Sequence, residues 1–248
     1  MTEARRGSDR WLYAIAGALV LAGVFHLLVF ALDDRAWSGP VSWRKPSTFG
    51  LSFGLTLATI TWLSSALRVR PHVRRALLVI FAIDCVVEVM GVSLQAWRDQ
   101  PSHLNTTTPT NAAIAYTLAV GGAVLILTLG TFAVIAIRGR VTGPPSLVLA
   151  YRAGFALLLS GLASGVAMIA VGSVAMRTGT AEHAYQVTGF LKQFHGATLH
   201  AVLVLPGAGW LVQRLTDDER LRVRAVGAVA GAYVAVAALL LVLGITNL

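Results

Sequence analysis

The stretch ALLVIFAIDCVVEVMGVSLQAW, residues 76–97, decides the fold class. A transmembrane helix needs about 20 predominantly apolar residues, and this stretch is long enough although it carries Asp84 and Glu88. The whole chain of 248 residues is 56% hydrophobic and 12% charged, whereas soluble domains carry about 25% charged residues. The sequence therefore predicts an integral membrane protein.

Further apolar stretches flank this one on both sides, and each is long enough to span a bilayer. They cover residues 11–32, 47–67, 109–137, 147–176, 187–212 and 223–246. The first lacks a small-residue cleavage site, so we expect a retained anchor and not a signal peptide. The prediction is an all-α, seven-transmembrane-helix bundle that forms a single transmembrane domain over residues 1–248, with no soluble catalytic domain.

The cations between the stretches predict the orientation, because Lys and Arg accumulate in cytoplasmic loops. With the N-terminus inside, 14 of the 20 cations are cytoplasmic: Arg5, Arg6, Arg10, Arg68, Arg70, Arg74, Arg75, Arg138, Arg140, Arg152, Arg214, Arg220, Arg222 and Arg224. The outer set is Arg35, Arg44, Lys45, Arg98, Arg177 and Lys192. We expect a multi-pass protein of the plasma (inner) membrane, with the N-terminus inside and the C-terminus outside.

Composition excludes several function classes. The net charge of +9 comes from cations scattered between apolar runs, which is not the basic face of a nucleic-acid-binding protein. The single Cys85 excludes a disulfide, a CxxC redox pair and a cysteine-based zinc site. Residues 216–224 contain both acidic and basic side chains and are predicted to form a solvated cytoplasmic turn.

A polar stripe runs along one face of residues 76–97 and continues to Arg98. At 100° per residue, its members are Asp84, Glu88, Gly91, Gln95 and Arg98. An ionisable side chain at a helix centre costs roughly 2.5 to 3.5 kcal/mol on insertion scales, so this stripe should face protein. Two interpretations stay open: a functional site, and a buried ion-pair network that fixes the helix register.

A second polar stripe starts near the outer end of residues 47–67. Its members are Lys45, Thr48, Ser52, Thr56 and Thr59. Trp43 precedes it, and the sequence allows either an interfacial anchor or a contact with the site. His26, near the outer end of the first stretch, is either an interhelical hydrogen-bond partner or a site residue.

The sixth stretch carries Lys192, His195 and His200, and the loop after the third carries His103 and Asn105. Thr108 as N-cap and Pro109 as first residue should start the next helix. The unusual polar residues lie in the predicted outer half, which points to a shared pocket. The small-residue motifs Gly161/Gly165 and Gly227/Gly231 predict close helix packing.

Three motifs resemble a widespread, uncharacterised family of bacterial integral membrane proteins. They are Trp43-Arg44-Lys45-Pro46, the run from Leu94 to Arg98 followed by Ser102 to Asn105, and His195 with His200-Ala201 and Leu205-Pro206. The chain departs from the family pattern at Ser47-Thr48, Asp99 and Leu203. The resemblance names no reaction, but it implies site roles for Lys45, Gln95, Arg98, His103, Asn105, His195 and His200.

These residues support several functions, and the sequence leaves open whether the protein is an enzyme. The first hypothesis is a membrane-embedded acid/base enzyme acting on a lipid-soluble, isoprenoid-like or quinone-like substrate, because a carboxyl in low dielectric can hold a proton. Its candidate catalytic residues are Glu88, Asp84, His195, His200 and Lys45. Its candidate binding residues are His26, Gln95, Arg98, His103, Asn105 and Lys192.

The alternatives use the same residues differently. A proton-coupled transporter or sensor would use Asp84 and Glu88 as a relay. A bis-histidine haem protein would take its axial ligands from His26, His103, His195 and His200. A zinc or iron site would combine Asp84 and Glu88 with His195 and His200. The expected partner is the lipid bilayer, and no nucleic acid.

Overall fold

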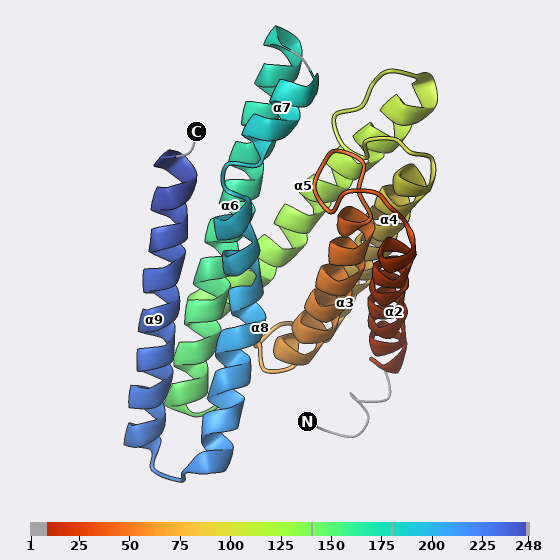
Figure 1. The fold of residues 1–248 in the computed structure, drawn as a ribbon. Helices are drawn as coiled ribbons and strands as arrows, with labels where there is room; N and C mark the ends of the chain where they lie inside the picture. The colour runs from red at the N-terminus through yellow and green to blue at the C-terminus, as the bar shows by residue number, and fades with distance from the viewer. Residues whose placement is uncertain (1–8, 140, 180, 247–248) are drawn as a thin grey trace. The chain divides into compact units, whose positions relative to one another are not determined.

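The computed structural model describes residues 9–139, 141–179 and 181–246, most of them helical. Arg5, Arg6 and Arg140 of the predicted cytoplasmic set lie outside these residues. The helices, labelled in Figure 1, are α2 (Arg10–Leu32), α3 (Arg44–Ser64), α4 (Pro71–Trp97), α5 (Pro109–Ile137), α6 (Pro145–Thr178), α7 (Ala181–Thr188), α8 (Lys192–Leu215) and α9 (Glu219–Thr246).

The chain divides into two compact units. The first contains Met1–Ser65 and Pro71–Leu129, and the second contains Ala66–Arg70 and Gly130–Leu248. Helix α5 therefore contributes its first part to one unit and its last turns to the other. The single transmembrane domain over residues 1–248 stays a prediction.

Six helices in the described part of the chain are long and apolar enough to cross a membrane. These spans are Arg10–Leu32, Pro71–Trp97, Pro109–Ile137, Pro145–Thr178, Ala184–Leu215 and Glu219–Thr246. Length and composition thus agree with a multi-pass integral membrane protein. The predicted seventh span is present as helix α3, but its many hydroxyl side chains leave it less apolar, and that it crosses the membrane stays a prediction.

Several helices extend beyond the predicted spans, and two predicted spans are broken or shortened in the structure. The helix expected over residues 47–67 ends at Ser64, and Leu67 instead forms an antiparallel bridge with Val141. The helix expected over 187–212 is interrupted between α7 and α8. There the N–H of Lys192 bonds the carbonyl of Gly189, three residues back, at 3.1 Å. Gly189 explains the interruption, because glycine is a poor helix former.

Within the first unit, α2 and α3 pack backbone against backbone. A Cβ added to Gly50 would lie 2.6 Å from the amide nitrogen of Gly23, and one added to Gly54 would lie 2.6 Å from the carbonyl oxygen of Ala16. Only glycine permits so close an approach, as in other membrane helix pairs. The sequence motifs singled out above did not include these glycines.

A buried ion pair joins the start of α2 to the start of α4. Arg74 donates to both carboxylate oxygens of Asp9, at 2.7 and 3.2 Å, and both side chains are about 10% exposed. The same guanidinium donates to the carbonyl of Thr61 and to the hydroxyl of Ser64, each at 3.0 Å. One arginine therefore fixes the ends of three helices.

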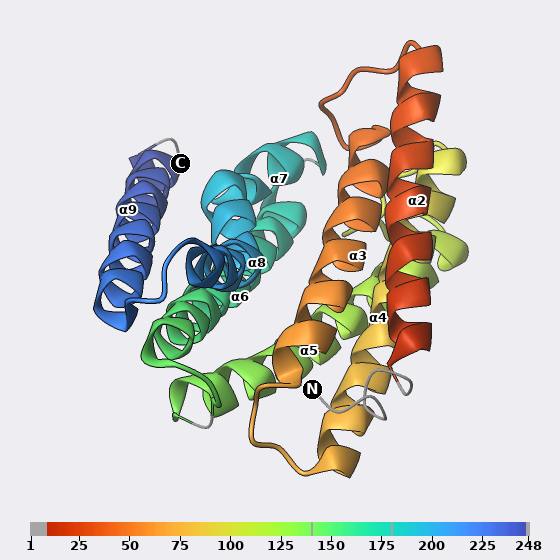
Figure 2. The same ribbon diagram turned by 90° about the horizontal axis from the view of Figure 1, so that it is seen from below.

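In the second unit, α8 packs against α6 and α9, and Figures 1 and 2 show these helices side by side. The motif at Gly161 and Gly165 is confirmed as a contact: a Cβ on Gly161 would lie 2.9 Å from the backbone nitrogen of Leu199. The predicted close packing at Gly227 and Gly231 is wrong for Gly231, because a Cβ on Gly231 would meet nothing within 4 Å.

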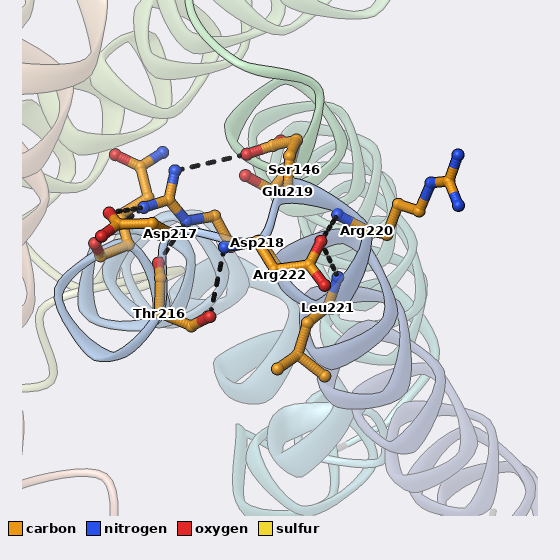
Figure 3. Close-up of polar contacts among 9 residues, drawn as sticks. Ser146, Thr216, Asp217, Asp218, Glu219, Arg220, Leu221 and Arg222 are labelled. Atoms are coloured by element: carbon orange, nitrogen blue, oxygen red, sulfur yellow. Dashed lines mark hydrogen bonds and ion pairs between the residues drawn. The ribbon is translucent and has the colours of Figure 1, made fainter.

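The loop between α8 and α9 is a turn, as the charge pattern predicted (Figure 3), and its cytoplasmic side stays a prediction. Asp218 accepts hydrogen bonds from the backbone N–H groups of Arg220 and Leu221, which caps α9. Arg222 donates to the carbonyl of Thr216 at 2.7 Å, and Glu219 accepts the N–H of Ser146 at 2.8 Å. These contacts are structural.

Candidate functional site

A pair of carboxyl groups lies in the middle of α4. Asp84 and Glu88 are one turn apart and only 5% and 3% exposed. They face Gly121 of α5, where an added Cβ would lie 2.9 Å from Oδ1 of Asp84 and still closer to Oε1 of Glu88. The absence of a side chain at Gly121 therefore makes room for both carboxyl groups.

The pair has no basic partner among the described residues of the first unit. No Lys, Arg or His nitrogen of that unit lies within 4 Å of either carboxyl group, and Oδ2 of Asp84 is buried without a hydrogen-bond partner. Within the described residues of this unit, the ion-pair interpretation is therefore wrong for Asp84 and Glu88. Burying a carboxylate without a partner is costly, which marks these groups for a role other than packing.

The upper part of the stripe is a network of amides. Gln95 is fully buried; its Nε2 donates to Oδ1 of Asn111 at 3.1 Å, and its Oε1 accepts from Arg98 at 2.6 Å. Arg98 also donates to Asn111 at 3.1 Å. The predicted burial of Gln95 is confirmed, whereas Asn111 was missed because its sequence context at a helix start gave no sign of a buried partner.

The same network folds the loop between α4 and α5. Asn111 donates to Oε1 of Gln100 and to Oγ1 of Thr107, both at 3.1 Å, while Oδ1 of Asn105 accepts the N–H of Thr107 at 3.2 Å. Thr108 caps α5 through the N–H of Asn111 at 3.2 Å, which confirms the predicted start of that helix. The hydrogen bonds of Gln95 and Asn105 therefore stabilise the conformation of this loop.

Ser102 and His103 are presented by this loop, between Asp99 and Leu104 in left-handed conformations with φ of 57° and 58°. Lys45 donates to Oγ of Ser102 at 3.3 Å, and Oγ lies 2.8 Å from Nδ1 of His103. Burial, together with the charge of Lys45, lowers the pKa of His103 from 6.5 to about 3. Ser102 was not among the predicted site residues; its place in the loop motif was the available signal.

The contacts of Ser102 bear on the tautomer of His103. An ammonium group only donates, so Oγ of Ser102 accepts from Lys45 and keeps its own proton to donate. When Ser102 donates that proton to Nδ1 of His103, the ring proton sits on Nε2. Lys45, Ser102 and His103 thus link α3 to the loop by successive hydrogen bonds.

His26 is held by two hydrogen bonds. Its Nδ1 donates to the carbonyl of Ala22 at 2.7 Å, and its Nε2 accepts the indole N–H of Trp97 at 3.2 Å. Trp43 stacks on the same imidazole and is only 1% exposed, so the interfacial-anchor interpretation of Trp43 is wrong. His26 belongs to an aromatic core in which both ring nitrogens are occupied.

The remaining predicted residues lie in the second unit. Nδ1 of His195 lies 2.8 Å from the carbonyl of Gly161 and 3.2 Å from Oγ of Ser164, and Nδ1 of His200 lies 2.6 Å from the carbonyl of Gly196. Lys192 lies over the ring of Tyr185 at 5.6 Å. That these residues join Glu88, Lys45 and His103 in one pocket stays a prediction.

The arrangement of the proposed ligands gives limited support to the haem hypothesis and to the zinc or iron hypothesis. The structure, over its described residues, contains no group of three or more His, Cys, Asp or Glu side chains placed to hold a metal ion. Nε2 of His26 accepts the N–H of Trp97, so this arrangement leaves it no lone pair for haem iron. The haem and metal hypotheses therefore lose the support that His26 and a preformed ligand cluster would give.

The hydroxyl stripe of α3 does not form one buried face. Thr59 is buried but Thr48 is exposed. Oγ1 of Thr48 donates to the carbonyl of Arg44, and Oγ1 of Thr59 donates to that of Leu55, each at 2.7 Å. A threonine that bonds its own helix needs no polar neighbour, so the exposure of Thr48 needs no site.

No family model, curated protein or solved structure matches the chain.

Proposed function

We propose that the chain is a membrane-embedded enzyme in which Asp84 and Glu88 exchange a proton with a lipid-soluble, isoprenoid-like or quinone-like compound. The observation that carries the proposal is the buried carboxyl pair without a basic partner among the described residues of its own unit. Two carboxylates one turn apart in low dielectric repel each other, so the pair retains a proton at lower free energy than it loses one. Such a pair offers both a proton donor and a proton acceptor.

The surroundings of the pair suit an apolar substrate. On α4, the residues before Asp84 back to Ala76 are all apolar, and the opposite wall at Gly121 has no side chain. Substrate would approach from the predicted outer leaflet, where the loop bearing His103 lies in the predicted topology. The likeness to the bacterial membrane family, which shares the loop motif, belongs to this proposal.

A proton-coupled transporter or sensor would use the same pair. It also needs a path onward from Asp84, and α4 offers no polar side chain between Asp84 and Arg75. This apolar stretch favours chemistry at the pair over passage through it.

The test is infrared spectroscopy of the purified full-length protein. A protonated buried carboxyl group gives a resolved C=O stretch, which we expect in the wild type and expect to lose in Glu88→Gln or Asp84→Asn. The exposed Asp34→Asn is the matched control and should leave the band unchanged. A wild type without the band, or a band that survives both pair variants, would overturn the proposal.

Stability and turnover separate the remaining interpretations. Because no cation of the described first unit faces Glu88, Glu88→Gln should keep the melting temperature while abolishing conversion of compounds extracted with the protein. A strongly lowered melting temperature would instead indicate a structural carboxylate, since breaking a buried ion pair costs about 3 to 5 kcal/mol. Bound compounds that the protein moves or senses without converting them would favour the transporter or sensor.

A further inference from the structure

Nε2 of His103 has no hydrogen-bond partner among the described residues of the first unit. Nδ1 is engaged by Ser102, and when the Ser102 hydroxyl donates this bond the ring proton is on Nε2. The residue is half-buried and not fully enclosed. Nε2–H is therefore a candidate donor to a ligand.

Two aromatic rings of α3 lie beside this donor. The ring centroid of Phe49 is 5.9 Å from that of His103, and Phe53 stacks on Phe49 at 5.5 Å with an interplanar angle of 19°. Both phenylalanines are half-buried, so part of each ring stays open. A planar ligand ring can pack on such a surface while its edge reaches the imidazole.

We propose that Nε2–H of His103 binds a carbonyl oxygen of a quinone-like ligand whose ring packs against Phe49. This inference rests on the proposed function and selects the quinone-like class from its two substrate classes. The ligand chemistry follows from the donor: a single neutral N–H and an aromatic surface match a planar ring bearing carbonyl groups, whereas a diphosphate head would call for several cationic donors.

The neutral state of His103 agrees with this assignment. Lys45 points its charge at Ser102, and the lowered pKa of His103 keeps the imidazole neutral at physiological pH. A neutral imidazole can polarise a carbonyl group by donating a hydrogen bond. The same property makes His103 a poor base, which argues against Ser102 as an activated nucleophile.

Ser102 and Lys45 are positioning residues in this proposal. Ser102 fixes the tautomer by donating to Nδ1, and Lys45 fixes the direction of the Ser102 hydroxyl. The amide network around Gln95 and Asn111 holds the loop that carries both Ser102 and His103. The loop motif of the sequence is thus explained as a support for one donor.

The test uses the full-length protein in nanodiscs, with ¹⁵N-labelled histidine and a decyl-substituted benzoquinone as the probe. Ring-nitrogen shifts should show the His103 proton on Nε2, and the probe should perturb that signal. Ser102→Ala should mix the two tautomers and Ser102→Thr should restore the single one. A purely structural serine would leave the tautomer unchanged in both variants.

Binding of the same probe is measured by titration calorimetry. His103→Phe should weaken it roughly two- to tenfold, the range for one lost hydrogen bond, while His103→Gln, which keeps an N–H donor, should stay within about twofold. The exposed His72→Phe is the matched control and should not change binding. A proton found on Nδ1, unchanged affinity in His103→Phe, or no quinone binding by the wild type would each overturn the inference.

These outcomes are distinct from those of the proposed function. The infrared band reports only on Asp84 and Glu88, so its absence would overturn acid/base chemistry at the pair while leaving quinone binding at His103 intact. A wild type that binds a polyprenyl diphosphate but not the quinone would overturn the His103 assignment and leave the carboxyl pair in place.

Discussion

Gly121 sets the space in which the carboxyl groups of Asp84 and Glu88 lie. A Cβ there would come within 3.2 Å of the Glu88 carboxyl carbon and 2.9 Å of Oδ1 of Asp84. Gly121→Ala should therefore destabilise the protein by about 1 to 3 kcal/mol, the range for overpacking. Thermal denaturation in detergent measures the change, with Gly122→Ala, where a Cβ meets nothing within 4 Å, as the control.

The cause of that loss is testable by a double-mutant cycle. A Glu88→Ala background removes the contact with Glu88 and leaves only the one with Oδ1 of Asp84 at 2.9 Å, so Gly121→Ala should cost less than in the wild type. An equal loss in both backgrounds would contradict the contact between Gly121 and Glu88.

The histidine at position 103 should make stability depend on pH. Its pKa is lowered from 6.5 to about 3 in the folded state, so the unfolded state binds the proton more tightly. The stability that the neutral imidazole contributes is fully present above pH 6.5. It is lost as pH falls from 6.5 towards 3, where the free energy of unfolding decreases by at most about 1.4 kcal/mol per pH unit. Between pH 6.5 and 5, the melting temperature of His103→Gln should fall less than that of the wild type; parallel curves would refute the assignment.

Depth and burial of single residues could be predicted from the sequence, but partners could not. Helical periodicity placed Asp84, Glu88 and Gln95 on a protein-facing face, and all three are buried. The periodicity carries no information on what a long side chain reaches. Arg98 donates hydrogen bonds to Gln95 and Asn111 and to no carboxyl group among the described residues. The conformation of the loop determines these partners.

At the scale of the helices, the close approach of α2 and α3 predicts a sharp difference between glycines. In Gly50→Ala the new Cβ would lie 2.6 to 2.8 Å from backbone atoms of Gly23 and Leu19. Backbone cannot move aside as a flexible side chain can, so the helix pair must separate and lose packing.

We expect Gly50→Ala to lower the melting temperature markedly or to prevent expression. Gly231→Ala on α9 is the matched control, because its Cβ would meet nothing within 4 Å, and it should behave as the wild type. Similar behaviour of the two variants would count against the packing of α2 on α3. The motif alone could not make this distinction, since a pair of glycines four residues apart does not show which helix faces it.

At the scale of the whole molecule, the membrane topology depends on α3. With seven crossings the two termini lie on opposite sides of the membrane, and with the six apolar helices alone they lie on the same side. Helix α3 has 21 residues, about 31 Å at 1.5 Å per residue, which matches a hydrocarbon core of about 30 Å. Its length therefore permits a crossing that its composition alone does not require.

The ion pair at the starts of α2 and α4 favours seven crossings. Asp9 directly precedes α2, Arg74 lies near the start of α4, and their side chains are 2.7 Å apart. If α2 crosses the bilayer, the chain must return to the first side before Arg74 can bond Asp9, and α3 is the helix between them. In the predicted orientation, the same return places Arg68, Arg70 and Arg75 on the side that the charge bias predicts to be cytoplasmic.

Reporter fusions test this topology. A reporter active only outside the cytoplasm should be inactive when fused at Arg70 and active at Leu248, because α3 brings the chain back inside and an odd number of crossings places the C-terminus outside. If α3 did not cross, every later segment would change sides and both results would reverse. Activity at Arg70 together with none at Leu248 would therefore refute the crossing of α3 and the seven-helix topology with it.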